Sequence, residues 1–380
     1  MTEKTAHILI VDDSPNEQQY IKHLLIEGGF VHIATAGSAE EALTHIAQHE
    51  TDLILLDVIM PGMDGLSLCR HLKNMPLTAD IPIILLTGLN DRQARIAAYN
   101  AGGSDYVVKP PHKAELLTRV RLLATNGRKR RELKTITNAR ERELTAAQTL
   151  QNSLLPTRTE LTKLSAHYKL GLHIFSRSCS ALTGDYWCVQ PLTNSTLLIA
   201  LLDMTGHGLG AAMNTLLLHR LIAQVKLSCH TPQEMLHLLN KHLSEKLMPG
   251  QTATGLVLIY DRTDKTLSYA GTAHPPLCYI AKNQPPELIT CAGLPLGLAM
   301  PKSYTYAAGI FQLGTGDTLY AYSDGLIDTP LPHHPKGIGL KGVQAYFTKT
   351  AAQTSAVRRK ALNAPPHVVD DLTVIELKGL

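Results

Sequence analysis

The first 124 residues alternate short apolar runs with segments of helical periodicity. The apolar runs predict strands at residues 7–11, 32–36, 53–57, 81–87 and 105–109. A run such as LILL is apolar on both faces of a strand, which is typical of a parallel sheet covered by helices on both sides. Helix starts are indicated by Ser14-Pro15, an N-cap and first helical residue, and by Ser38 with Glu41, a capping box. The pattern predicts a doubly wound α/β domain with a five-stranded parallel sheet.

Polar residues follow these predicted strands at their carboxyl ends: Asp12, Asp13, Asp57, Thr87 and Lys109. The carboxyl ends of parallel strands open onto one crevice, so these side chains should converge there. Three neighbouring carboxylates repel one another unless a cation joins them, which predicts a Mg²⁺ site. Asp57 is then the candidate nucleophile toward a phosphoryl group, with Lys109 and Thr87 on the phosphoryl oxygens. Helix capping would explain one such residue, but it explains poorly five at matching strand ends.

The same residues resemble those of a response-regulator receiver domain over residues 5–124. The motifs that carry the resemblance are Asp12-Asp13, Asp57 followed by VIMPGMDG, Thr87, and YVVKP at 106–110. The resemblance implies that a sensor histidine kinase phosphorylates Asp57. It also implies that Mg²⁺ is held by Asp13, Asp57 and the backbone carbonyl of Ile59, with Asp12 nearby through water.

The resemblance assigns two further features. Thr87 and Tyr106 match the switch pair, in which a hydroxyl shift and a ring rotation report phosphorylation. The Lys109-Pro110 bond matches one that is cis in the family. Pro111 is a departure, since an aromatic residue is common there, and it affects loop shape and leaves the chemistry intact.

Residues 125–156 are highly charged and predict a helix that ends at Pro156. Its apolar residues approximate heptad a and d positions, at Leu133, Ile136, Ala147, Leu150 and Leu154. Arg140 and Glu143 interrupt that seam, which favours a weak parallel coiled coil and hence a homodimer. The basic run at 128–131 would suit nucleic acid or an anionic membrane, but the acids that follow favour a solvated helix face.

The last 220 residues predict a different architecture. Strands are expected at 195–203, 253–261, 265–271, 276–281, 317–324 and 371–377, and helices at LGAAMNTLLLHRLIAQV, PQEMLHLLNKHLSEKL and GVQAYFTKTAA. Neighbouring strands with segregated helices indicate an α+β domain of two stacked antiparallel sheets flanked by helices. The predicted organisation is therefore an α/β domain at 1–124, a helical coiled-coil linker at 125–156 and an α+β domain at 157–380.

Acids stand at the edges of the predicted strands in this last part: Asp185, Asp203, Asp324, Asp370 and Asp371. Turns and caps would explain each acid alone. If they gather in space, oxygen-only ligands favour Mn²⁺ or Mg²⁺ over zinc. Two such ions ~3.5–4 Å apart would share a water and direct it at a phosphoryl group. His207 is expected to be structural or to shuttle protons, because it stands in a glycine-flanked helix entry.

The order of these acids resembles that in SpoIIE-type, protein phosphatase 2C-like serine/threonine phosphatases, from about Gln148 to the C-terminus. The motifs are QTLQNSLLP, GDYW (184–187), DMTGHG (203–208), AHPP (273–276), GLPLGL (293–298), GDTLYAYSDGLID (316–328) and DDLTV (370–374). The implied site comprises the metal ligands Asp185, Asp203, Asp324 and Asp370, the carbonyl of Met204, and the further positions Gly184, Gly206, His207, Gly208 and Asp371. The choice between Asp370 and Asp371 stays open. The implied substrate is a phosphoserine on an anti-sigma factor antagonist, with the anti-sigma factor as a second candidate partner.

Cys188 stands where the family pattern has a second acid on the hairpin of Asp185. A thiol there would pack as a small hydrophobic group, and we expect restoring an acid to leave activity unchanged or to raise it. Two functions follow from the residues. The first is a metal-dependent phosphatase controlled by Asp57. The alternative is a catalytically weakened fold that acts as a phosphorylation-gated binding module for an anti-sigma factor or its antagonist.

Composition and charge argue against several kinds of partner and site. A net charge of +4 over 380 residues is too small for a nucleic-acid footprint by itself. The six cysteines form no CxxC pair, so neither a zinc site nor a disulfide framework is indicated. The longest apolar run is far short of the ~20 residues that span a bilayer, and no signal peptide is recognised. We expect a cytoplasmic protein that binds neither nucleic acid nor membrane.

Overall fold

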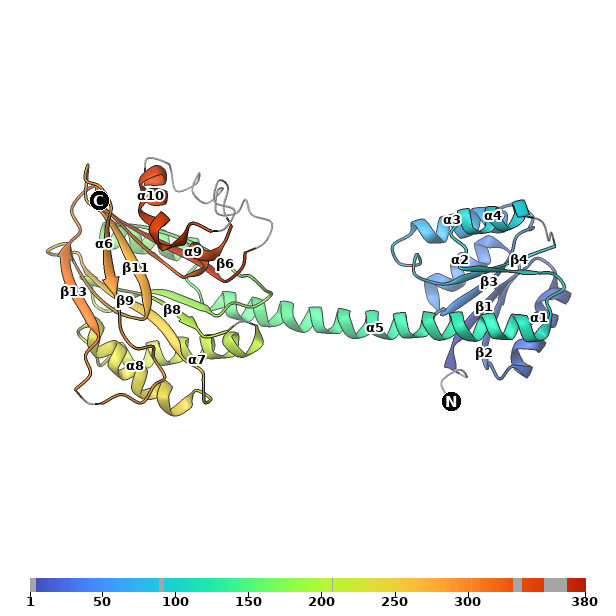
Figure 1. Ribbon diagram of the computed structural model, residues 1–380, viewed down its shortest axis with the longest axis horizontal. Helices are drawn as coiled ribbons and strands as arrows, with labels where there is room; N and C mark the ends of the chain where they lie inside the picture. The colour runs from blue at the N-terminus through green and yellow to red at the C-terminus, as the bar shows by residue number, and fades with distance from the viewer. Residues whose placement is uncertain (1–4, 89–91, 207, 302, 331–336, 352–367) are drawn as a thin grey trace. The chain divides into compact units, whose positions relative to one another are not determined.

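The computed structural model describes residues 5–88, 92–206, 208–301, 303–330, 337–351 and 368–380. The chain divides into two compact units, residues 1–141 and 142–380 (Figure 1). Among the described residues, no helix is long and apolar enough to cross a membrane.

The first unit contains the predicted parallel sheet. Its strands are β1 (His7–Val11), β2 (His32–Ala36), β3 (Leu53–Asp57), β4 (Ile83–Thr87) and β5 (Asp105–Val108). They are all parallel and lie in the order β2-β1-β3-β4-β5. Every residue of β3 and β4 is buried, because helices cover both faces of the sheet. The doubly wound fold is confirmed.

The helices of this unit begin where the caps indicate. They are α1 (Pro15–Glu27), α2 (Ala39–Gln48), α3 (Gly65–Asn74) and α4 (Arg92–Asn100). Ser14 caps α1 and Pro15 is its first residue, as predicted. Ser38 caps α2 by accepting the Glu41 N–H. The Glu41 carboxylate, however, accepts the N–H of Gly37 and not that of Ser38, so the capping box is shifted by one residue.

One helix, α5 (Lys113–Ser153), begins in the first unit and ends in the second. The helix expected at 125–156 is thus the C-terminal part of α5, and it ends at Ser153, three residues before Pro156. Gly127 lets α5 approach the sheet closely, since a Cβ atom there would lie 1.9 Å from the carbonyl oxygen of Asp52.

The second unit contains two antiparallel sheets, as predicted, and each sheet has five strands. One has the order β13-β10-β9-β8-β7 and the other β12-β11-β14-β15-β6. The strands are β6 (Leu170–Arg177), β7 (Asp185–Pro191), β8 (Thr196–Met204), β9 (Ala253–Asp261), β10 (Thr266–Thr272), β11 (His274–Ile280), β12 (Glu287–Cys291), β13 (Ala307–Gln312), β14 (Thr318–Tyr322) and β15 (Leu372–Gly379). The helices are α6 (Arg158–Tyr168), α7 (Leu209–Val225), α8 (Pro232–Lys246), α9 (Gly325–Asp328) and α10 (Gly339–Ala351).

The core of this unit has three layers of apolar contact. One cluster fills the space between the two sheets and includes Trp187 and Val189 of β7. A second cluster joins the β7-containing sheet to α7 and α8 and includes Tyr186 and Cys188. A third packs α10 against the other sheet. Successive residues of β7 therefore point alternately into the inter-sheet core and toward the helices.

Candidate functional site

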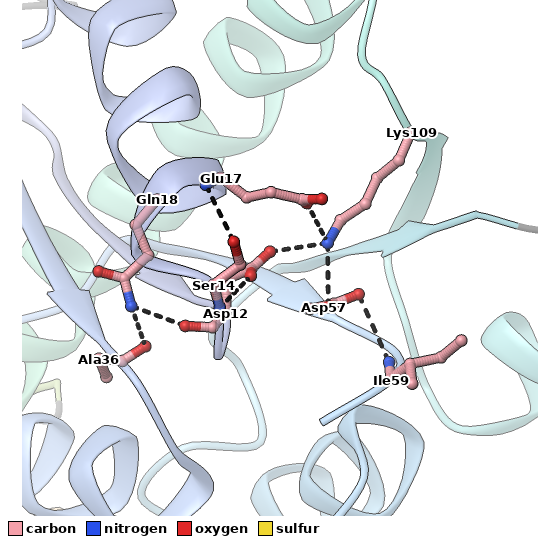
Figure 2. Close-up of polar contacts among 8 residues, drawn as sticks. All are labelled: Asp12, Ser14, Glu17, Gln18, Ala36, Asp57, Ile59 and Lys109. Carbon is pink, nitrogen blue, oxygen red and sulfur yellow. Dashed lines mark hydrogen bonds and ion pairs between the residues drawn. The ribbon is translucent and has the colours of Figure 1, made fainter. Parts of the chain in front are cut away.

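In the first unit, one ammonium group holds three carboxylates at the carboxyl edge of the parallel sheet (Figure 2). Lys109, just after β5, places its Nζ atom 2.7 Å from Asp12 Oδ2, 2.9 Å from Asp57 Oδ2 and 2.5 Å from Glu17 Oε2. Asp12 and Asp57 are buried, since Asp12 directly follows β1 and Asp57 is the last residue of β3, and both strands are central in the sheet. The predicted convergence of Asp12, Asp57 and Lys109 is present.

The electrostatics of this crevice suit a further cation. Burial raises the pKa of Asp57, and the hydrogen bond and charge of Lys109 only partly oppose that rise. Burial lowers the pKa of Lys109, but bonds to Asp12, Glu17 and Asp57 outweigh it, so the net pKa is raised and the ammonium stays charged. One carboxylate oxygen from each of Asp12, Asp13 and Asp57 lies within 4.8 Å of the others. Three anions that close fit a divalent ion with oxygen ligands.

The other expected residues surround this crevice. The Ile59 N–H donates to Asp57 Oδ1 at 3.4 Å, while its side chain is exposed. Thr87 is buried at the end of β4. Tyr106 is half-buried on β5 and packs edge-on against Tyr99. The Lys109-Pro110 bond is cis, as the resemblance implied.

Two further residues take part in this crevice that the sequence analysis did not predict. Glu17 lies in the first turn of α1 and binds Lys109. Gln18 donates from Nε2 to the carbonyl oxygens of Asp12, at 2.6 Å, and Ala36, at 3.2 Å, which ties the ends of β1 and β2 together (Figure 2). An acid in a first turn is usually only a favourable dipole partner, so Glu17 gave no separate signal.

In the second unit, two acids face each other across an antiparallel pair. Asp185 of β7 is directly opposite Asp203 of β8. Asp185 is buried, and its Oδ2 accepts a 2.6 Å hydrogen bond from the Thr373 hydroxyl. Its Oδ1 is buried without a hydrogen-bond partner among the described residues. A buried, unpartnered carboxylate oxygen facing a second acid is unfavourable without a cation, so the pair fits a metal site.

Acids beside the other sheet add to the negative charge around Asp185 and Asp203. Burial, and then the charges of Asp324, Asp370 and Asp371, raise the pKa of Asp203 to about 8. Burial and the charge of Asp203 raise the pKa of Asp185 well above its usual range, while the hydroxyls of Thr373 and Ser323 oppose the rise. Burial, and then Asp370, also raise the pKa of Asp324. The separated acids are thus close enough to disfavour one another's ionisation.

The acids form a looser set than the one in the first unit. Among the described residues, the only other group of three ligand atoms within 4.8 Å of one another is Cys179, Asp370 and Asp371. In the set implied by the resemblance, Asp185, Asp203, Asp324 and Asp370, no three carboxylate oxygens from different residues all lie within 4.8 Å of one another.

Asp370 and Asp371 have different surroundings. Asp371 is buried and accepts hydrogen bonds from the Ser178 hydroxyl (2.9 Å) and from the N–H groups of Cys179 (2.8 Å) and Gly184 (2.5 Å). Its oxygens are therefore used to hold the loop before Asp185. Asp370 is exposed and accepts only the Asp371 N–H among the bonds described, at 2.8 Å. This favours Asp370 as the ligand and Asp371 as a positioning residue.

Glycines line the entry to α7. The N–H of Met204 donates to the carbonyl of Gly184 at 3.2 Å. A Cβ at Gly184 would lie 3.2 Å from the Gly206 carbonyl oxygen and 3.3 Å from that of Met204, so the two loops pack closely. Gly206 and Gly208 have φ of 89° and 82°, which glycine adopts without strain. His207, an expected site residue, lies outside the described residues.

Comparison with known families matches each of the two units to a family model. Residues 8–121 match the model of the response regulator receiver domain, and residues 193–379 match that of Stage II sporulation protein E (SpoIIE). The chain joins a receiver domain to a SpoIIE-type domain. The receiver domain is 40% identical over 119 residues to response regulator PleD of Caulobacter vibrioides, covering 31% of this chain and 26% of PleD. It is 41% identical over 121 residues to protein PetR of Rhodobacter capsulatus, covering 32% of this chain and 49% of PetR.

A solved structure supports the fold of the SpoIIE-type domain. The SiaA-PP2C domain of Pseudomonas aeruginosa superposes with a TM-score of 0.55 at 19% identity, covering 65% of this chain and 99% of that domain. At this identity the likeness concerns the protein phosphatase 2C-like fold. This chain spans about a quarter to a half of the length of the receiver-domain relatives named above.

Cys188 of the SpoIIE-type domain lies on the face of β7 that points away from the Asp185 side chain. It is three residues from Asp185 on β7, so the two side chains leave opposite faces of the strand. Asp185 reaches Thr373 on the opposing sheet, whereas Cys188 is buried against α7 and α8. Burial raises the pKa of its thiol to about 12. The packing expectation is met. An acid at position 188 would enter this apolar core, which opposes the expectation that restoring one would leave activity unchanged or raise it, and that expectation stays a prediction.

The long helix α5 contacts the loop that carries Asp185. Gln151 is buried, and its Nε2 donates to the Thr183 carbonyl and to the Thr215 hydroxyl, both at 2.8 Å. Its Oε1 accepts the Thr183 N–H at 3.2 Å. Gln151 thus joins α5, the Asp185 loop and α7. The sequence predicted this helix but gave no indication that Gln151 faced inward.

Proposed function

We propose that this protein is a two-component response regulator in which phosphorylation of Asp57 controls a metal-dependent phosphoprotein serine/threonine phosphatase. The observation that carries the proposal is the buried Asp185 directly opposite Asp203, with one carboxylate oxygen unpartnered among the described residues. When ionised, such a pair is unfavourable unless cations compensate its charge, and metal-bound water is one nucleophile that hydrolyses phosphate esters.

On the input side, Asp57 is the phosphoacceptor. A carboxylate oxygen attacks the phosphorus of a phosphohistidine on a sensor kinase, an O–P bond forms and the N–P bond breaks. Lys109 lies within 2.9 Å of the Asp57 carboxylate and offsets charge on the phosphoryl oxygens. Asp12, Asp13 and Asp57, with the Ile59 carbonyl, would hold Mg²⁺, which supplies further positive charge there.

On the output side, Asp185, Asp203, Asp324 and Asp370, with the Met204 carbonyl, would hold two Mn²⁺ or Mg²⁺ ions. The ions would supply an activated water and positive charge on the phosphoryl oxygens. The chain's own residues hold these ligands in position. Asp371 fixes the Gly184 N–H, and the Thr373 hydroxyl orients the Asp185 carboxylate.

The coupling runs along α5. This helix starts in the receiver unit and ends beside Gln151, which holds the Asp185 loop. Three apolar side chains of the expected heptad seam, Leu133, Ile136 and Leu150, are each more than half exposed. An exposed apolar seam on a helix supports the proposal of a parallel homodimer whose register responds to Asp57 phosphorylation.

The substrate class rests on the resemblance to SpoIIE-type phosphatases. We infer that it is a phosphoserine on an anti-sigma factor antagonist, with the anti-sigma factor as a possible second partner. The alternative is a phosphorylation-gated binding module without turnover. One observation favours it: the four acids do not come within 4.8 Å of one another as a group.

The experiment that separates these functions measures phosphate release from a phosphoserine protein by the full chain in Mn²⁺. The phosphatase proposal expects turnover that EDTA abolishes and that Asp203→Asn reduces by at least ~10³-fold, since a direct ligand is lost. Metal-independent background in the wild type, equal to that of Asp203→Asn, would support the binding module.

A further inference from the structure

Four imidazoles gather at the edge of the receiver sheet opposite the phosphorylation crevice. His7 and His32 are the first residues of β1 and β2 and are direct partners in the parallel register. His45 and His49 lie one turn apart at the end of α2. All four line one cavity of about 180 Å³, the histidine pocket.

The fold explains why the four side chains share a face. Residues at alternate positions of a strand point the same way, and His7 is in phase with Leu9 and Val11, which pack with α2 residues. His32 is in phase with Ala36, which packs in the same cluster. The strand pair therefore faces the helix that carries the other two histidines.

The rings are arranged as two stacked pairs. The His7 and His32 centroids are 4.7 Å apart with an interplanar angle of 11°. Those of His45 and His49 are 4.5 Å apart at 13°. Two imidazolium cations at that separation would repel each other. Burial, and then the charge of His49, lower the pKa of His45. Neutral imidazole is the form that binds a metal ion.

We propose that the histidine pocket binds one transition-metal ion of the class of Zn²⁺, Ni²⁺ and Cu²⁺. Imidazole nitrogen suits these ions, whereas the oxygen-only crevice at Asp57 suits Mg²⁺. Histidines at i and i+4 on one helix face are a recurrent chelating pair, and the in-register strand pair supplies a second. The His49 Nδ1 lies 3.3 Å from the His45 carbonyl oxygen, which orients that ring and leaves Nε2 for an ion.

Binding requires a small rearrangement. Among the described residues, no three ligand atoms of this pocket lie within 4.8 Å of one another. His32 and His49 are exposed, so their rings can turn inward without disturbing the core. Glu50 also lines the pocket, but its carboxylate pairs with Arg131 of α5 at 2.7 Å, so the four imidazoles alone are assigned as ligands.

The test uses the full chain in excess Mg²⁺, which competes for the oxygen-ligand sites. Zn²⁺ affinity is measured by equilibrium dialysis against a competing chelator, and Cu²⁺ coordination by electron paramagnetic resonance. We expect one Zn²⁺ equivalent that is weakened about 100-fold or more in His45→Asn/His49→Asn, because two direct ligands are lost. The control His71→Asn removes an exposed histidine of α3 outside the pocket and should leave the affinity unchanged.

The Cu²⁺ spectrum tests the wild-type protein without any variant. Couplings from several imidazole nitrogens that disappear in the double variant support the site. Wild-type Zn²⁺ affinity in both His45→Asn/His49→Asn and His7→Asn/His32→Asn, or a spectrum without nitrogen couplings, overturns it. Unchanged phosphorylation of Asp57 in the variants shows that the receiver fold is intact.

Discussion

Gln151 donates a 2.8 Å hydrogen bond from Nε2 to the carbonyl of Thr183, two residues before Asp185. This bond connects the helix that begins in the receiver to the loop that positions a proposed metal ligand. Gln151→Ala removes it and leaves both backbone groups of Thr183 without that partner, at a cost of about 1–3 kcal/mol. We expect the Mn²⁺ concentration for half-maximal phosphatase activity to rise roughly 10-fold.

The matched control for Gln151→Ala is Gln148→Ala, which changes the same residue type on an exposed position of the same helix. It should leave the Mn²⁺ requirement unchanged, and neither variant should affect Asp57 phosphorylation. Equal Mn²⁺ requirements in Gln151→Ala and wild type would show that this contact does not position the site.

Cys188→Asp should destabilise the protein and should not improve the metal site. The new carboxylate would enter the apolar layer between β7 and the helices α7 and α8, at a cost of about 3 kcal/mol or more in the free energy of unfolding. Cys188→Ala, which introduces no charge, is the control and should lose less stability. Denaturant titrations measure both, and a Cys188→Asp protein as stable as the wild type would contradict this placement.

Strand alternation explains why the spacing of the motif did not show which way Cys188 faces. A motif with acids three residues apart suggests one site, but β7 is regular, so positions 185 and 188 face opposite sides. The receiver crevice was predictable because Asp12, Asp57 and Lys109 all end parallel strands, and strand ends meet at one edge. Glu17 and Gln151 were not predictable, since they lie on helices whose faces are set by packing. The choice between Asp370 and Asp371 depends on hydrogen bonds that only the folded chain reveals.

Asp370 and Asp371 should fail in different ways when changed to Asn. Asp370→Asn is expected to weaken Mn²⁺ binding by at least ~10-fold with little change in melting temperature, because the residue is exposed. Asp371→Asn loses charge-assisted bonds to Gly184 and Cys179, so it should lower the unfolding free energy by about 1–3 kcal/mol. Calorimetric Mn²⁺ titration and thermal melts of the same samples compare the two. The reverse pattern would exchange their roles.

Metal removal should change the pH dependence of stability. The pKa of Asp203 is raised to about 8 from 3.8, so the folded protein holds a proton that the unfolded chain releases. The contribution of Asp203 to metal-free stability should therefore fall as the pH rises from about 4 to about 8. Mn²⁺ should stabilise the protein more at pH 8 than at pH 5, since the acids must ionise to bind it.

Thermal melts in EDTA and in Mn²⁺ across that pH range measure this effect, with Asp203→Asn as the control because it cannot ionise. In EDTA, the wild type should lose stability with rising pH more steeply than the variant. Identical pH profiles for the two proteins would mean that Asp203 is not held in a repulsive acid cluster.

The central claim is that Asp57 phosphorylation controls phosphatase activity in the other unit. It is tested most directly by the rate of Mn²⁺-dependent phosphate release from a phosphoserine antagonist protein, with and without a small-molecule phosphodonor in Mg²⁺. The account predicts that the phosphodonor changes the wild-type rate at least ~10-fold and leaves the Asp57→Asn rate unchanged. A wild-type enzyme that turns over at the same rate with and without phosphorylated Asp57 would contradict it.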